Sequence, residues 1–236
     1  MKVLVLGYGK LGKEIVSQSN WDYICRGKNN FDFCNINSYS KYLYQYDTII
    51  NCIANTNTYS NDKKSMMDIN FKAVCNLVDF CNLYNKKLLH ISTDYIYDKS
   101  VENASEEDVP VHAQNWYSYS KLLADGYMQN FCDNYLLIRT SFKSNPFPYP
   151  KAITTQKGNF DYTDKVVEKI IKLVNNNASG IYNVGHEKSW TIYEMALETN
   201  KDVVACDDIL NESMPTNITM NMEKYNEFIR NIDSNL

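Results

Sequence analysis

Two stretches decide how this chain folds: Leu88-Leu-His-Ile-Ser-Thr-Asp-Tyr95 and, after a polar loop, Tyr117-Ser-Tyr-Ser-Lys121. The apolar run from Leu88 to Ile91 is bounded by polar residues and predicts a buried strand of a parallel sheet. The polar residues 92–94 follow at the strand's carboxyl end, where open α/β sheets bind ligands. Tyr117 and Lys121 open a helical pattern and stand four residues apart, so they lie on one face of that helix.

The spacing of Tyr117 and Lys121 has a chemical use. A phenol with a pKa of about 10 donates a proton poorly at neutral pH, and a neighbouring ammonium lowers that pKa. A hydroxyl from the strand end, such as that of Thr93, would hold a substrate carbonyl beside the tyrosine. The set would then protonate the carbonyl oxygen as a hydride arrives, or run the reverse. In a chain with 19 tyrosines, the pair alone also arises by chance.

The start of the chain supports this interpretation. An apolar and β-branched run, residues 1–6, leads directly into Gly7-Tyr-Gly9-Lys-Leu-Gly12 and then into a helical pattern through Val16. Strand, glycine turn and helix in this order are what a dinucleotide-binding fingerprint requires, with the helix N-terminus facing the pyrophosphate. The alternative is an ordinary turn between a strand and a helix.

Together the two motifs resemble the short-chain dehydrogenase/reductase superfamily. The chain is most similar to the sugar-nucleotide branch around the dTDP-4-dehydrorhamnose reductases. The resemblance covers nearly the whole chain in the family's order. The segments that carry it are Gly7/Gly9/Gly12, Asn51–Ala54, Asn70, His90–Tyr97, Tyr117/Lys121, Ile138–Phe142, Asp161–Asp164 and Gly180–Gly185.

The resemblance implies an α/β fold, a Rossmann-type doubly wound parallel sheet with a small C-terminal substrate-binding region. The dinucleotide-binding core is expected at residues 1–142. Residues 143–236 would form mainly the substrate-binding region, with a part around 160–185 returning to the core. Residues 143–151 are too rich in proline for a helix, and relatives commonly carry a longer helical insertion here. The substrate region is therefore expected to be compressed.

The resemblance also implies a nicotinamide cofactor, with NADP(H) favoured and NAD(H) left open. Arg26, with Lys28 nearby, follows the second predicted strand and suits a 2′-phosphate; a solvated surface arginine is an equal alternative. Asn35 stands where the family often has an aspartate. The expected cofactor-binding residues are Gly7, Tyr8, Gly9, Lys10, Leu11, Gly12, Arg26, Asn35, Ile36, Cys52, Ile53, Ala54, Tyr117 and Lys121.

The implied function is an NADPH-dependent reductase of a nucleotide-linked 4-keto-6-deoxy sugar, such as a dTDP- or UDP-4-dehydrorhamnose, with hydride delivered to C4. Thr93 would orient the carbonyl, Tyr117 would supply the proton, and Lys121 would tune the tyrosine and bind the cofactor ribose. The expected substrate-binding residues are Asp94, Tyr95, Asn55 and Lys143, although a solvated surface lysine is the stronger alternative for Lys143.

Alternatives to simple reduction stay open. Tyr95 stands where related 4,6-dehydratases have a glutamate and where epimerising relatives have a cysteine, which argues against both chemistries. A bifunctional epimerase/reductase using another base remains, as does a non-catalytic NADP-binding regulatory subunit.

The amino-acid composition bears on the other classes of protein to which the chain could belong. The 236 residues are 44% hydrophobic with a net charge of −4, which gives no reason to expect binding to nucleic acid or membranes. No signal peptide or long apolar run is apparent. The seven cysteines form no CxxC pair and predict reduced thiols, no metal site and a cytoplasmic protein. A homodimer is compatible with these features. His112 is expected at the surface.

Overall fold

The computed structural model describes residues 1–27, 30–58, 60–98, 100–108, 115–206 and 214–234. The chain packs as two compact units. The first consists of Met1–Ser92, Trp116–Ile138 and Ala178–Gly180, and the second of Thr93–Asn115, Arg139–Asn177 and Ile181–Leu236. The expected domain boundary after residue 142 stays a prediction. Lys28 and His112, both considered from the sequence, lie outside the described residues.

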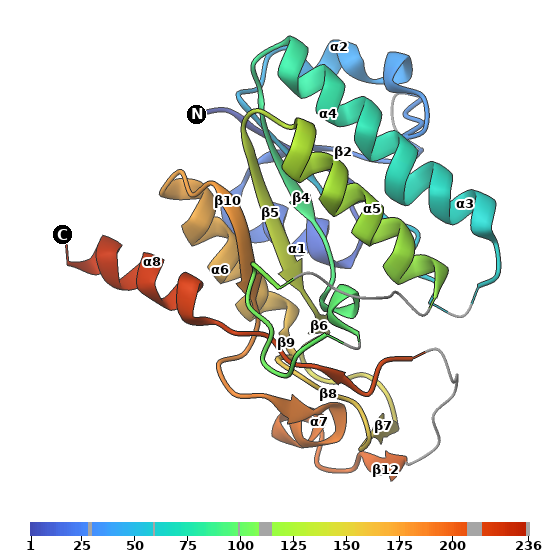
Figure 1. The fold of residues 1–236 in the computed structure, drawn as a ribbon, viewed down its shortest axis with the longest axis vertical. Helices are drawn as coiled ribbons and strands as arrows, with labels where there is room; N and C mark the ends of the chain where they lie inside the picture. The colour runs from blue at the N-terminus through green and yellow to red at the C-terminus, as the bar shows by residue number, and fades with distance from the viewer. Residues whose placement is uncertain (28–29, 59, 99, 109–114, 207–213, 235–236) are drawn as a thin grey trace. The chain divides into compact units, whose positions relative to one another are not determined.

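A six-stranded sheet forms the centre of the first unit (Figure 1), although Arg139–Thr140 of β5 and Ile181–Val184 of β10 are counted with the second unit. The strand order is β10-β5-β4-β3-β1-β2, and the pairs from β5 to β2 are all parallel. The sheet and its flanking helices confirm the predicted Rossmann-type fold. The strands are β1 (Val3–Leu6), β2 (Asp22–Ile24), β3 (Thr48–Asn51), β4 (Lys87–Ile91), β5 (Tyr135–Thr140) and β10 (Gly180–Val184).

The direction of the crossovers places helices on both faces of this sheet. From β1 the chain moves one way to β2, whereas from β3 it moves the opposite way to β4 and β5. Right-handed crossovers therefore put α1 on one face and α4 and α5 on the other (Figure 1). The strand order reverses between β1 and β3, and the crevice at that point is where such sheets bind ligands. The helices are α1 (Lys10–Ser19), η1 (Ile36–Ser38), α2 (Ser40–Leu43), α3 (Lys63–Met67), α4 (Ala73–Leu83) and α5 (Trp116–Phe131).

The helical spacing of Met66, Ile69, Val74, Leu77 and Val78 predicts one long helix over about residues 65–84, and the structure shows this helix with an interruption. Between α3 and α4, residues Asp68–Lys72 form a π-helical turn, η2. Asn70 lies in this turn and is fully buried. The apolar residues of α4, among them Val74 and Leu77, are buried against the rest of the first unit, as their helical spacing predicts.

The second unit consists of short strands and three longer helices. Its sheets have the strand orders β11-β8-β13, β12-β7 and β6-β9. Its three longer helices are α6, α7 and α8. The elements are η3 (Asp94–Tyr97), β6 (Phe142–Lys143), β7 (Lys151–Ile153), β8 (Lys157–Gly158), β9 (Asp161–Tyr162), α6 (Thr163–Asn175), β11 (Trp190–Thr191), α7 (Ile192–Thr199), β12 (Val204–Cys206), β13 (Asn217–Ile218) and α8 (Glu223–Asp233).

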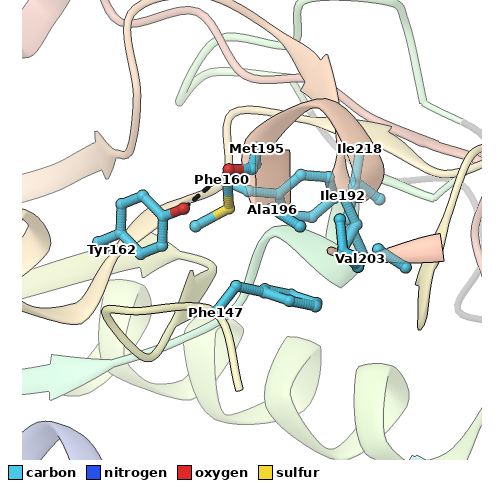
Figure 2. Close-up of a cluster of buried hydrophobic side chains, with 9 residues drawn as sticks. Phe147, Phe160, Tyr162, Ile192, Met195, Ala196, Val203 and Ile218 are labelled. Atoms are coloured by element: carbon cyan, nitrogen blue, oxygen red, sulfur yellow. Dashed lines mark hydrogen bonds between the residues drawn. The ribbon is translucent and has the colours of Figure 1, made fainter. Parts of the chain in front are cut away.

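An apolar cluster holds part of the second unit together (Figure 2). It contains side chains from the proline-rich segment, from the small strands and from α7, so this region has a hydrophobic core of its own. The Tyr162 hydroxyl donates to the Met195 carbonyl at 2.7 Å, which satisfies the polar end of a buried ring. Tyr95 packs against the cluster from outside. The members are Phe147, Ala152, Phe160, Tyr162, Ile192, Met195, Ala196, Val203 and Ile218.

Candidate functional site

A glycine turn joins β1 to α1 at the carboxyl edge of the first unit's sheet. Gly7 has a φ of +95°, which side chains rarely adopt, and a Cβ there would lie 2.7 Å from the Ile53 side chain. A Cβ at Gly12 would lie 2.1 Å from the carbonyl oxygen of Gly7. The turn and the helix can touch only because neither position carries a side chain.

The middle glycine has a different surrounding. Gly9 precedes α1 without a side chain to cap it, and the first turn of α1 has no acidic residue. A Cβ at Gly9 would meet no heavy atom within 4 Å. The space beside Gly9 is therefore open at the start of α1, where Lys10 is exposed and Leu11 is buried. Free helix N–H groups at a positive dipole end suit an anionic group, so this turn fits the pyrophosphate of a dinucleotide.

The other predicted cofactor residues near β2 lie in different settings. Arg26 is exposed just beyond the strand. Tyr8 stacks on Tyr23 of β2, with ring centroids 4.0 Å apart and planes inclined by 13°. Asn35 is exposed and its side chain caps η1, while Ile36 is half-buried. The cofactor roles of these residues stay predictions.

Residues 52–54 leave the end of β3 and are half-buried, with Asn55 next. The Asn55 N–H donates to the Asn70 Oδ1 at 2.7 Å, and the Asn55 side-chain amide donates to Ser65. Asn70 Nδ2 in turn donates to the Asn55 carbonyl at 2.9 Å and to the Ser120 Oγ at 3.0 Å. Buried Asn70 therefore ties this segment to α5, and Asn55 contributes to the unit's interior. A substrate contact for Asn55 stays a prediction.

Helix α5 carries the predicted Tyr and Lys pair. Tyr117 is half-buried in the first turn, and Lys121 lies one turn later with only 1% of its surface exposed. Lys121 Nζ donates to the Ile91 carbonyl at 2.6 Å and lies 2.8 Å from His90 Nε2. Burial lowers the pKa of Lys121 to about 8, although Asp125 on the same helix acts to raise it. The amine thus changes charge within the neutral to mildly alkaline range.

The second unit holds the residues that follow β4. Thr93 Oγ1 accepts the Tyr95 N–H at 3.2 Å and so caps η3. Asp94 is fully buried, and burial raises its pKa to about 7 against the opposing effect of Lys143. The Tyr95 hydroxyl accepts from the Gln156 side chain at 3.3 Å. Thr93 and Asp94 are thus positioned by local turn geometry.

The predicted site residues are divided between the two units. The glycine turn, Ile53 and Lys121 all belong to the first unit, whereas Thr93, Asp94, Tyr95 and Lys143 belong to the second. The predicted grouping of Thr93 with Tyr117 stays a prediction.

His90 had no predicted role in the sequence beyond its place in a motif. A histidine between two apolar residues of a buried strand was the available signal, because a buried ring nitrogen needs a partner.

Two further findings concern the described part of the chain. None of its His, Cys, Asp and Glu side chains gather into a group that could hold a metal ion. Its helices are also too short or too polar for any of them to traverse a lipid bilayer.

Comparison with known proteins gives the family. The model described as the RmlD substrate binding domain matches residues 1–143, which is more than half of the chain. The chain belongs to this family. The resemblance found in the sequence is thereby confirmed.

Curated relatives match at low identity. The mouse dTDP-D-glucose 4,6-dehydratase is 25% identical over 137 residues, which are 48% of this chain and 39% of that protein. The chain therefore spans about two fifths of that dehydratase. The spore coat polysaccharide biosynthesis protein SpsK of Bacillus subtilis is 25% identical over 219 residues, covering 83% of this chain and 77% of the relative.

Solved structures extend the similarity of fold to the whole chain. A hypothetical dTDP-4-dehydrorhamnose reductase from Sulfolobus tokodaii has a TM-score of 0.81 at 22% identity, covering 96% of this chain and 94% of the other. The dTDP-4-dehydrorhamnose reductase of Bacillus anthracis, in complex with NADP, has a TM-score of 0.82 at 21% identity, covering 97% and 93%. The residues of the second unit thus belong to the same fold as these proteins, and the expected compression of this region stays a prediction.

Proposed function

We propose that the chain is an NADPH-dependent reductase of a nucleotide-linked 4-keto-6-deoxy sugar, a dTDP- or UDP-4-dehydrorhamnose or a close analogue. The observation that supports this proposal most is the position of Lys121. Its Nζ binds the carbonyl at the end of β4, and the glycine turn follows β1 of the same parallel sheet. The carboxyl ends of parallel strands share one edge, so the basic group and the dinucleotide turn lie on the same edge of the first unit.

Each residue has a defined task in this proposal. Tyr117 donates a proton to the carbonyl oxygen, and the Lys121 ammonium strengthens that acid by favouring the phenolate that remains. Thr93 orients the carbonyl by hydrogen bonding. Asp94, Tyr95, Asn55 and Lys143 contact the sugar nucleotide. The nicotinamide, when bound, supplies the hydride.

The cofactor is proposed to be NADP(H), with NAD(H) as the alternative. The similar protein from Bacillus anthracis is described in complex with NADP, and WbmH of Bordetella bronchiseptica in complex with NAD⁺. Exposed Arg26 beyond β2 supports NADP(H), since arginine suits a 2′-phosphate. A cytoplasmic location and a homodimer belong to the same proposal.

The decisive experiment incubates the purified chain with NADPH and the dTDP- or UDP-linked 4-keto-6-deoxy sugars, both the 4-dehydrorhamnose and the 4-keto-6-deoxyglucose forms, and identifies the products by NMR. Tyr117→Phe should lower the turnover at least about a hundredfold, the low end of what a positioned acid contributes, and leave NADPH binding intact. Tyr119→Phe is the matched control, because Tyr119 lies on the same helix, is 42% exposed and has Leu123 rather than a lysine four residues later.

Two outcomes would contradict the reductase. One is tight NADPH binding without reduction of either sugar, which would favour the regulatory subunit and lead to a search for its partner enzyme. The other is a Tyr117→Phe variant as active as the parent. Reduction accompanied by inversion at a neighbouring carbon would identify the bifunctional epimerase/reductase.

A further inference from the structure

Three buried polar side chains of the first unit are connected in a row that ends at Lys121, four residues after the predicted acid Tyr117. Asn51 ends β3 and stands directly opposite His90 of β4 in the sheet register. Asn51 Nδ2 lies 3.0 Å from His90 Nδ1, and His90 Nε2 lies 2.8 Å from Lys121 Nζ. Asn51 and His90 have no exposed surface and Lys121 has 1%. With both ring nitrogens engaged, the imidazole connects the asparagine to the lysine.

We propose that Asn51 and His90 are positioning residues that set the charge of Lys121, and that they couple this charge to the backbone turn leaving β3. The effect on catalysis rests on the proposed function, because it acts through Lys121 on Tyr117. The hydrogen-bonded chain itself does not depend on that function.

The hydrogen-bond donors and acceptors allow one arrangement in the structure as it stands. Asn51 Oδ1 accepts the Ile53 N–H at 3.0 Å, which turns the amide nitrogen toward His90. An amide nitrogen only donates, so His90 Nδ1 accepts and the ring proton resides on Nε2. That proton points at Lys121 Nζ, which can accept it only as a neutral amine. Nζ then donates to the Ile91 carbonyl.

A charged Lys121 requires the opposite arrangement. An ammonium has no lone pair, so His90 Nε2 must accept and the ring proton must reside on Nδ1. Nδ1–H then needs an acceptor, which Asn51 supplies if its amide turns over and presents Oδ1. This releases the Ile53 N–H from its hydrogen bond. The net change is the uptake of one proton by the amine, with the neutral imidazole exchanging tautomers.

The surrounding groups make Lys121, rather than the His90 ring, the group that gains or loses a proton. Burial holds the pKa of His90 well below its usual value, and Lys121 adds to this effect; the ring therefore stays neutral. Asp125 from α5 and Cys52 from the segment after β3 act to raise the pKa of Lys121, but burial outweighs them. The change of charge is consequently placed near pH 8 rather than at the usual pKa of about 10.4 for a lysine.

Ile53 determines which charge state of Lys121 a bound ligand would favour. Its side chain approaches Gly7 of the dinucleotide turn, and its N–H is the group released when Asn51 turns over. Binding that takes up the Ile53 N–H would favour the ammonium form of Lys121, which is the form that strengthens the Tyr117 acid. The hydrogen-bonded side chains would thus favour protonation of Lys121 when a ligand is bound at the carboxyl edge of the sheet.

The test measures the His90 tautomer directly. The protein has three histidines, so selective ¹⁵N labelling of histidine gives few signals, and His90→Gln identifies the one that belongs to His90. The wild-type ring should carry its proton on Nε2 above about pH 8 and on Nδ1 below it, in a single transition. In Lys121→Met the ring should keep one tautomer over roughly pH 6 to 10, because the titrating amine is gone. A wild-type ring with one tautomer throughout, or a transition that persists in Lys121→Met, would overturn the proposal.

Asn51→Asp provides an independent arm. A carboxylate only accepts, so His90 should carry its proton on Nδ1 and the transition should move upward by at least about one pH unit, equal to a tenfold change in the equilibrium. An unchanged transition in a folded Asn51→Asp variant would also reject the proposal. If the wild type shows the tautomer exchange but reduces no sugar nucleotide, the proposed function fails and the hydrogen-bonded chain stands. If the enzyme is active but its tautomer is constant, the proposed function stands and the coupling through His90 fails.

Discussion

Gly12→Ala should destabilise the protein, and the size of the effect follows from one distance. The added Cβ would lie 2.1 Å from the Gly7 carbonyl oxygen and 3.1 Å from its carbon. Cβ atoms rarely come closer than about 3 Å to such atoms, so the turn and α1 must separate by roughly 1 Å. Both contacts are to backbone, which cannot rotate away. Forcing extra atoms into a packed site costs about 1–3 kcal/mol, and a backbone contact belongs at the upper end. We expect a loss of at least about 2 kcal/mol.

Thermal unfolding followed by circular dichroism measures this effect without any cofactor or substrate. A loss of about 2 kcal/mol corresponds to a Tm lower by roughly 4–8 °C for a chain of this size. Gly126→Ala is the matched control. Gly126 lies within α5 and an added Cβ there meets no heavy atom within 4 Å, so this variant should gain about 0.4–1 kcal/mol by restricting the unfolded chain.

The two variants together separate the possible causes. If Gly12→Ala unfolds at the wild-type temperature, the close approach of the turn to α1 is not part of the folded protein, and the case for a dinucleotide turn loses its geometric basis. If Gly126→Ala is destabilised as strongly as Gly12→Ala, the loss reflects glycine replacement in general rather than the contact at Gly7.

Three other predictions concern the predicted site. Arg26→Ala should weaken NADPH binding by about 1.5–3 kcal/mol, as for a charged hydrogen bond, and NADH binding much less in calorimetry; equal losses would remove the case for a 2′-phosphate contact. Tyr95→Phe removes the acceptor for Gln156 and should raise KM or lower kcat in steady-state assays with cofactor affinity unchanged; unaltered kinetics would place Tyr95 away from the sugar. Asp94 has a raised pKa, so its contribution to stability is full below about pH 4 and is lost as the pH rises through about 7. In urea unfolding Asp94→Asn should lack this loss, and a wild-type stability that rises over the same range relative to the variant would contradict the assignment.

The fold was predictable because its signals are local. Short apolar runs bounded by polar residues indicated the parallel strands, and the glycine spacing indicated the first turn. The helix at about 65–84 was predicted as one element because its apolar residues keep a helical spacing through most of its length. The π-helical turn at Asp68–Lys72 could not be predicted in this way, since one additional residue barely disturbs that pattern.

The predicted site was only partly accessible from the sequence. The pairing of Tyr117 with Lys121 depends on four residues of helix and could be inferred directly. The contact of His90 with Asn51 depends on the register of β3 against β4, and its contact with Lys121 depends on the packing of α5. Both contacts join residues 30 to 40 positions apart in the sequence. The Asn70 contacts with Asn55 and Ser120 are non-local in the same way.

The π-helical turn constrains the number of residues that the helix from α3 to α4 can contain. Each residue rotates an α-helix by about 100°, and the additional residue in Asp68–Lys72 sets the angular phase of α3 against that of α4. Deleting one residue would turn one segment relative to the other. Either Asn70 would leave Ser120 or the apolar side of α4 would leave the core. Insertions and deletions should therefore be absent from this helix among proteins that retain both features, while the loop before it can vary in length.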